Sequence, residues 1–208
     1  WQDQKSKSYR SFDKEKMTGL MKKLDGQKAV VEEIKKTPKK TYAPLLYDLT
    51  ELQREANQRF GYSAKETLNI MQRLYENHKV LTYPRTDSRY LSKDIVPTIK
   101  DRLEACGTGP YRKLAMTAKK KDLSGKLAFV NDAKVSDHHA IIPTEQFVDL
   151  SHMTNEERKI YDLVVRRFLA VLYPPFEYEQ TQVTVKVGGE TFLASGKIVK
   201  AQGWRAVY

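Results

Sequence analysis

The sequence predicts an α+β, multidomain fold in which a mainly helical domain is inserted into a β-rich domain. Two capping boxes, in which Ser63 and Thr154 are each followed three residues later by a glutamate, predict helix starts in the middle of the chain. After Pro174 and Pro175, the apolar residues change from helical spacing to the alternation of a strand. In chain order we expect a first part of the β-rich domain with a leading helix (1–42), a helical domain (43–174) and the second part of the β-rich domain (175–208).

The first segment is predicted to hold one helix and one strand. Four apolar residues recur at helical spacing over 13–24, and Gly26 follows as a stop. These residues are Met17, Leu20, Met21 and Leu24. The apolar run at 29–34 then favours a strand, and the lysines and proline at 35–40 indicate a boundary.

Four helices are expected in the middle of the chain, separated by loops. They are predicted over residues 45–60, 63 to about 76, 92 to about 105, and 154–173. In the second helix, the residues expected to face inward are Leu68, Met71, Leu74 and Tyr75, with Gln72 and Glu76 on another face. A short extended run, Lys79–Thr82, then delivers Tyr83 to a turn before Pro84. The Gly- and Lys-rich stretch from 106 to 137 is weakly patterned.

The C-terminal segment is predicted to form a hairpin. Polar and apolar residues alternate from 178 to 187, Gly188 and Gly189 suit a tight turn, and 191–199 reads as the return strand. A third strand is expected to start at 205–208. We expect the strand near the N-terminus to pair with this hairpin in one β-rich domain.

Composition restricts the possible functions. The chain has 208 residues, a net charge of +11 and one cysteine, Cys106. A single cysteine excludes a disulfide or a multi-thiolate zinc site within the chain, and favours a reducing cytoplasm. No apolar run approaches the length of a membrane span. The positive charge favours a nucleic-acid partner, although a solvated basic surface is an equal alternative. Because the chain begins at Trp1, we expect it to be part of a longer polypeptide.

The segment from Leu81 to Leu91 contains the strongest candidate for chemistry. A free phenol, with a pKa of about 10, is a poor nucleophile at neutral pH and needs a nearby cation or base. Arg85 stands two residues after Tyr83, so on an extended backbone both side chains point to one side, and the guanidinium suits a phosphate. The neighbours expected to help are Thr82 and Thr86, as donors to phosphate oxygens, and Asp87, which either orients Arg85 or caps the next turn. The alternative is a core tyrosine beside a surface arginine.

Two further groups are candidates for the same site. His138 and His139 precede an apolar run and suit hydrogen bonding to a phosphate or a departing 3′ oxygen, or proton transfer. The alternative is an ordinary turn histidine, and adjacent residues on a strand are poorly placed to share a metal. Gln72 and Glu76 stand four residues apart on one helix face, where they either flank Tyr83 or are simply solvated.

Taken together, these residues resemble the type IA DNA topoisomerases, most closely the bacterial topoisomerase III branch. Five segments carry the resemblance in order, and they span most of the chain from residue 45 to its end. These segments are 47–57, 72–76, 81–91, 138–144 and 189–204.

The resemblance implies a role for each site residue. Tyr83 is then the nucleophile that forms a 5′-phosphotyrosyl bond with single-stranded DNA, and Arg85 binds the scissile phosphate. His138 is the family histidine, with His139 beside it, and Gln72 and Glu76 take the family's glutamine and glutamate positions. The reaction passes another strand through the gap and reseals it without ATP, which relaxes or decatenates DNA.

The resemblance also implies what the chain lacks. In this family a Toprim domain carries a catalytic glutamate and an acidic cluster for Mg²⁺. No such cluster stands in this sequence, so the fragment is expected to bind no metal itself. We expect a central fragment: the tyrosine domain and both halves of the β-rich domain that hinges it. Its expected partners are single-stranded DNA, the Toprim and arch domains of the same polypeptide and, as a further candidate, a helicase. The fragment alone should bind DNA weakly and lack full activity, and the enzyme should be cytoplasmic and associated with the nucleoid.

Two other function classes fit parts of the pattern. A rolling-circle replication initiator also uses a tyrosine nucleophile, but its metal-binding histidines are separated by one apolar residue, whereas His138 and His139 are adjacent. A non-catalytic module that binds single-stranded DNA suits the charge, but does not need the arrangement from Tyr83 to Asp87.

Overall fold

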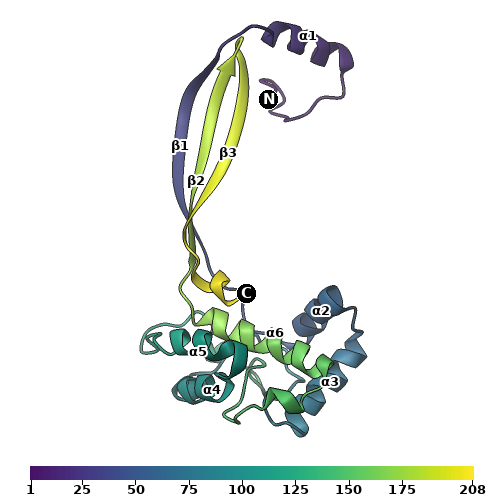
Figure 1. Cartoon of the computed structure of the whole chain (residues 1–208), viewed down its shortest axis with the longest axis vertical. Coiled ribbons are helices and arrows are strands. Elements are labelled where there is room, and N and C mark those ends of the chain that lie inside the picture. Colours follow the sequence, from purple (N-terminus) through teal and green to yellow (C-terminus); the bar gives the residue numbers. More distant parts are fainter. The chain divides into compact units, whose positions relative to one another are not determined.

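The computed structural model describes residues 1–208 and confirms the α+β class, with six α-helices and one antiparallel sheet of three strands. The residues divide into two compact units (Figure 1). The first unit contains Trp1–Thr41 and Phe176–Gln202, and the second contains Tyr42–Pro175 and Gly203–Tyr208. That these units act as a hinge domain and a catalytic domain stays a prediction.

The first unit is built on the sheet. Its strands are β1 (Ala29–Thr41), β2 (Phe176–Val187) and β3 (Glu190–Ala201), in the order β1-β2-β3, and Figure 1 shows them side by side. The predicted pairing of the N-terminal strand with the C-terminal hairpin is therefore confirmed. Gly188 and Gly189 both have positive φ angles, as a tight hairpin turn requires.

Strand β1 is longer than predicted. It continues through the lysines at 35–40, where the sequence indicated a boundary, and Pro38 lies opposite Glu179. A proline is tolerated there because β1 is an edge strand, so the missing amide donor need not face a neighbouring strand. Helix α1 (Lys14–Leu24) agrees with the helix predicted over 13–24 and is capped by Asp13, but none of its residues is fully buried.

The second unit is helical. Its helices are α2 (Leu49–Phe60), α3 (Ala64–Glu76), α4 (Ile99–Cys106), α5 (Arg112–Ala118) and α6 (Asn155–Val171). Both predicted capping boxes are present: Ser63 and Thr154 each accept a bond from the glutamate amide three residues later, and that glutamate side chain accepts one in return. In Figure 1, α2 and α3 lie to one side of α6, and α4 and α5 to the other.

Three helical predictions in this unit need correction. Helix α2 begins at Leu49, not at residue 45, because Asp48 caps it. The helix expected from residue 92 is a 3-10 helix, Lys93–Thr98, before α4 starts, and Pro97 inside it lacks the amide donor of a regular turn. Helix α5 lies in the stretch that showed only a weak pattern.

The C-terminal residues also differ from the prediction. A 3-10 helix, Gly203–Val207, stands where a third strand was expected, and it belongs to the helical unit. The Trp204 amide donates to the Pro174 carbonyl at 2.9 Å, and Val207 is buried in the core of this unit. Gly203 has φ of +49°, and a Cβ there would lie 2.1 Å from the Pro175 carbonyl oxygen. The chain end is thus fixed against α6 by burial and not by strand pairing.

Candidate active site

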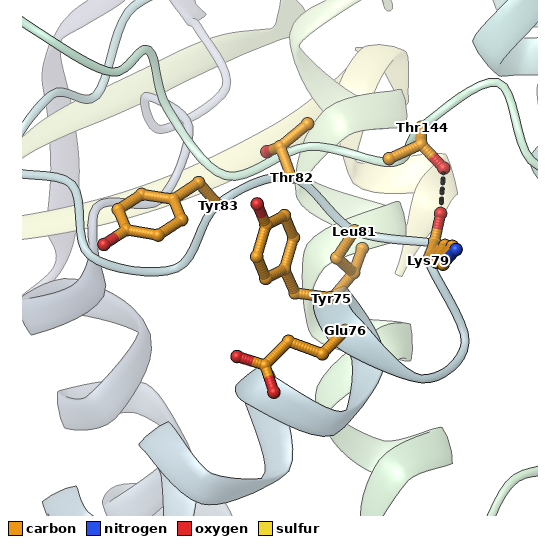
Figure 2. Close-up of a pocket in the computed structure, with 7 residues that line it drawn as sticks. All are labelled: Tyr75, Glu76, Lys79, Leu81, Thr82, Tyr83 and Thr144. Carbon is orange, nitrogen blue, oxygen red and sulfur yellow. Dashed lines mark hydrogen bonds between the residues drawn. The ribbon is translucent and has the colours of Figure 1, made fainter.

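The loop after α3 carries Tyr83 and is held by hydrogen bonds to the segment 140–144. The Thr144 hydroxyl donates to the Lys79 carbonyl at 2.6 Å, the dashed line in Figure 2. The Thr82 amide donates to the Ile142 carbonyl, and the Ile142 amide donates to the Thr82 hydroxyl oxygen, both at 3.0 Å. Only an isolated bridge at Leu81 forms where a short strand was expected. The loop therefore has a fixed course without regular secondary structure.

The two threonines expected to contact phosphate have partners within the protein. The Thr82 hydroxyl accepts from Ile142 and donates to the Ala140 carbonyl at 3.4 Å. The Thr86 hydroxyl donates to the His138 carbonyl at 2.9 Å and accepts from the Ser88 amide. In this geometry both hydroxyls hold the tyrosine loop against the histidine segment.

The ring of Tyr83 lies between two other rings. His138 packs against it with a centroid distance of 4.2 Å and an interplanar angle of 34°. Tyr75, from the last turn of α3, meets it at 5.5 Å and 80°. The structure thus brings Tyr83 and His138 together, although they are 55 positions apart in sequence. Figure 2 shows the Tyr83 hydroxyl pointing away from the other labelled side chains.

A pocket lies on each side of this ring stack. The first, here called the tyrosine pocket, has a volume of about 560 Å³. It is lined by Tyr75, Glu76, Lys79, Leu81, Thr82, Tyr83 and Thr144 (Figure 2). The second, here called the arginine pocket, has a volume of about 450 Å³. It is lined by Asp48, Leu49, Thr50, Arg85, Thr86, Asp87, Ser136, Asp137 and His138.

Tyr83 and Arg85 therefore line different pockets, contrary to the expectation that both point to one side. The backbone bends at Pro84, and the Thr86 amide donates to the Pro84 carbonyl at 3.1 Å, so this stretch is a turn and not an extended strand. His138 contacts the Tyr83 ring and also lines the arginine pocket. The histidine is thus the side chain that connects the two pockets.

The arginine pocket carries an exposed guanidinium and several carboxylates. Asp87 lines it with Arg85, but the two side chains form no ion pair, so an orienting role of Asp87 stays a prediction. Asp48 is occupied in capping α2, since its carboxylate accepts from the Glu51 amide at 2.7 Å. The Leu49 amide at this helix start donates to the Thr86 carbonyl. Arg85 is therefore the principal group in this pocket suited to an anionic ligand.

The remaining predicted residues divide into two groups. Glu76 lines the tyrosine pocket, whereas Gln72, one turn earlier on α3, is not among the lining residues. His139 lines neither of these two pockets and bonds through Nδ1 to the Ala140 carbonyl at 2.7 Å. Burial lowers the pKa of His139, which favours the neutral ring. The two adjacent histidines thus have different surroundings.

Tyr75 belongs to the site, but its role was not apparent from the sequence. The helical pattern predicted that it faces the core with Leu74, yet it is 37% exposed. The residues of α3 that are buried are Thr67, Ile70, Met71 and Leu74. Because Tyr75 lies at the edge of that stripe in the last turn, a pattern of spacing alone could not separate it from the core residues.

A buried carboxylate, Glu157, fixes the chain just before the tyrosine loop. Glu157 accepts from Arg73 Nε at 2.9 Å, pairs with His78 Nε2 at 3.0 Å and accepts from the Thr154 amide at 3.0 Å. Burial by itself raises the pKa of Glu157, but these hydrogen bonds outweigh it and the pKa is lowered. The N-terminus of α6 is thereby tied to the end of α3. The capping box was the sequence signal that could have identified this glutamate.

A second buried network explains the segment around Tyr47. Arg167 of α6 donates to Glu55 at 2.6 Å, to the Tyr47 hydroxyl at 2.9 Å and to the Leu45 carbonyl at 2.9 Å. The Tyr47 hydroxyl also donates to Glu55. Burial raises the pKa of Tyr47, so the phenol stays protonated and serves as a donor. These residues fix α2 against α6.

Two kinds of feature, a cluster of metal ligands and a membrane-spanning helix, are absent from the structure. No group of three or more His, Cys, Asp or Glu side chains is arranged to bind a metal ion. None of the helices has both the length and the apolar character needed to cross a membrane.

Comparisons with known proteins identify the family. A sequence model described as DNA topoisomerase matches residues 1–208. DNA topoisomerase 3 of Bacillus subtilis (strain 168) is 60% identical over all 208 residues, which cover 29% of that protein. DNA topoisomerase 3 of Bacillus cereus (strain ATCC 14579) is 62% identical over the whole chain, which covers 28% of it.

A solved structure agrees with these matches. Full-length topoisomerase I from Thermotoga maritima superposes with a TM-score of 0.68 at 26% identity, over 97% of this chain and 32% of that one. The chain thus spans less than a third of the length of these relatives. From the full-length family match, the identity of 60% and the shared fold, we conclude that the chain belongs to the type IA DNA topoisomerases, with bacterial DNA topoisomerase 3 proteins among its relatives.

Proposed function

We propose that the chain is the central part of a type IA DNA topoisomerase, in which Tyr83 cuts and reseals single-stranded DNA. The observation that carries this proposal is the position of Tyr83, whose ring packs on His138 between two pockets, one of which contains Arg85. A phenol beside an open cleft, with a guanidinium and an imidazole nearby, provides a nucleophile and groups that stabilise a phosphate.

The reaction is a transesterification. The Tyr83 oxygen attacks phosphorus, the bond from phosphorus to the 3′ oxygen breaks, and a 5′-phosphotyrosyl ester forms. The phenol loses its proton, and the departing 3′ oxygen gains one. Attack by the 3′ hydroxyl reverses these steps. Because the ester preserves the energy of the phosphodiester, resealing needs no ATP.

Arg85 and His138 support the proposed reaction in different ways. From the arginine pocket, the Arg85 guanidinium contacts the phosphate and offsets the charge that develops on its oxygens. His138 faces both Tyr83 and that pocket, so its ring is placed to hydrogen-bond the phosphate or the 3′ oxygen, or to move a proton. Thr82 and Thr86 position the loop through their protein hydrogen bonds.

The whole enzyme needs parts that this chain does not contain. We propose that Mg²⁺ is held by a Toprim domain elsewhere in the polypeptide, as the resemblance to the family implies, and no step above passes through a metal. The proposed substrate is single-stranded DNA, which the net charge of +11 attracts. Changes of DNA topology, by relaxation or decatenation, are a proposed property of the full-length protein in the cytoplasm. A helicase is a proposed further partner.

A covalent trap with labelled DNA tests the nucleophile. The full-length enzyme is incubated with a 3′-labelled single-stranded oligonucleotide, denatured and separated by gel electrophoresis. We expect Tyr83→Phe to abolish the covalent adduct while single-strand binding persists, because only the hydroxyl is removed. Tyr90→Phe, in the same loop, is the matched control and should keep the adduct. An undiminished adduct in Tyr83→Phe would refute the assignment.

A further inference from the structure

The tyrosine pocket contains side chains that the proposed reaction does not use. Its volume of about 560 Å³ falls within the usual range of small-molecule sites. Among its side chains, the Tyr75 ring offers exposed apolar surface, whereas Leu81 is fully buried. The hydroxyls of Thr82 and Thr144 are already hydrogen-bonded to backbone groups, so they have little capacity left to bond a ligand in the pocket. The pocket therefore favours a flat, largely apolar group over a phosphate.

Tyr75 is the side chain best placed to contact such a group. Its ring meets Tyr83 almost at right angles, an arrangement that covers only part of it, and 37% of the residue is exposed to solvent. Figure 2 shows the Tyr75 ring between Tyr83 and Leu81. Exposed aromatic rings beside basic surface are the platforms on which single-stranded nucleic acids stack their bases.

We propose that the tyrosine pocket binds the nucleobase adjacent to the scissile phosphate, with Tyr75 as its stacking platform. This inference rests on the proposed function of Tyr83. Because Tyr83 lines the pocket, a nucleotide whose phosphate lies at the Tyr83 oxygen has its neighbouring base within reach of Tyr75. The phosphate itself is held from the other side of the ring stack, where Arg85 lies. Stacking accepts any base, so this contact holds the strand in place without selecting its sequence.

Cleavage of abasic oligonucleotides by the full-length enzyme tests the proposal, because each product length reports which phosphate was cut. A set of strands carries one abasic site, moved along the sequence. In the unsubstituted enzyme, cleavage at a phosphate should fall about five- to tenfold when the missing base is the adjacent one. In Tyr75→Ala, cleavage of intact DNA should fall by a similar factor, and the abasic site should cause little further loss, because the two changes remove the same contact.

Three variants separate stacking from a purely structural role of Tyr75. Tyr75→Phe retains the ring and should behave as the unsubstituted enzyme. Tyr75→Leu retains apolar bulk against Tyr83 but should lose the dependence on the adjacent base. Tyr42→Ala, which removes a tyrosine that is 72% exposed and outside the pocket lining, is the matched control and should change nothing.

Two results would overturn the proposal. One is unchanged cleavage by the unsubstituted enzyme when the base on either side of the cut phosphate is missing. The other is a loss in Tyr75→Ala that multiplies with the abasic loss, which would mean that Tyr75 only holds Tyr83. Either result leaves Tyr83 as the nucleophile, whereas an adduct that survives Tyr83→Phe refutes the proposed function separately.

Discussion

Replacing Glu157 with alanine should destabilise the helical unit by about 3 kcal/mol. The carboxylate is 4% exposed and accepts bonds from Arg73, His78 and the Thr154 amide. Breaking a buried ion pair costs about 3–5 kcal/mol, and a lost helix cap about 1 kcal/mol. The low end applies because the Arg73 side chain is 44% exposed and can be rehydrated once its partner is gone.

Urea unfolding of the 208-residue chain, followed by circular dichroism at 222 nm, measures this effect on the helical unit. Glu156→Ala is the matched control, since Glu156 occupies the same first turn of α6 but is exposed. We expect the control to lose no more than about 0.5 kcal/mol. If the free energies of unfolding of Glu157→Ala and Glu156→Ala differ by less than about 0.5 kcal/mol, the bonds of Glu157 do not stabilise the unit as expected here.

The same carboxylate gives a dependence on pH with a defined sign. The folded-state pKa of Glu157 is lowered from the ordinary value of 4.5, so the unfolded state binds its proton more readily. The stabilisation is therefore fully present above pH 4.5 and is lost as the pH falls through the folded-state pKa. The difference in free energy of unfolding between the unsubstituted chain and Glu157→Gln should accordingly decrease as the pH is lowered.

Two other substitutions test the site and the chain end. Arg85→Ala in the full-length enzyme should slow adduct formation by about 100-fold, because a donor to the developing phosphate charge is lost, while single-strand affinity measured by anisotropy changes far less. Equal losses would make Arg85 a general backbone contact. Gly203→Ala should cost at least about 2 kcal/mol in urea unfolding, since φ is +49° and the new Cβ would meet the Pro175 carbonyl. Gly125→Ala, with open space around it, is the control, and a similar cost for both would contradict the clash.

Local interactions made much of the fold predictable. Each capping box joins residues three positions apart, so Ser63 and Thr154 predict the starts of α3 and α6 from the sequence. The hairpin turn is equally local, because Gly188 and Gly189 alone satisfy its positive φ angles. The pairing of β1 with β2 is not local, and it could be inferred only because both ends of the chain showed strand patterns.

Contacts between distant residues account for what the sequence did not reveal. The Arg167 bonds to Glu55 and Tyr47 join residues more than 100 positions apart, and no spacing rule connects them. Residues 203–208 pack on α6 through Val207 and Trp204, so burial decided their conformation over strand propensity. The same holds for Tyr75, whose partner Tyr83 lies beyond the end of its helix.

The segment around Tyr83 shows why the geometry of a loop is hard to predict from its sequence. A loop without helix or sheet must satisfy its backbone through side chains, and the hydroxyls of Thr82 and Thr86 do this. Threonines beside Tyr83 and Arg85 therefore indicate a loop of fixed conformation as much as a phosphate site. The bend at Pro84 leaves Tyr83 and Arg85 lining different pockets, and His138 contacts the Tyr83 ring while lining the pocket of Arg85. An extended backbone would have placed both side chains on one face, so this turn is the feature that the spacing of Tyr83 and Arg85 could not predict.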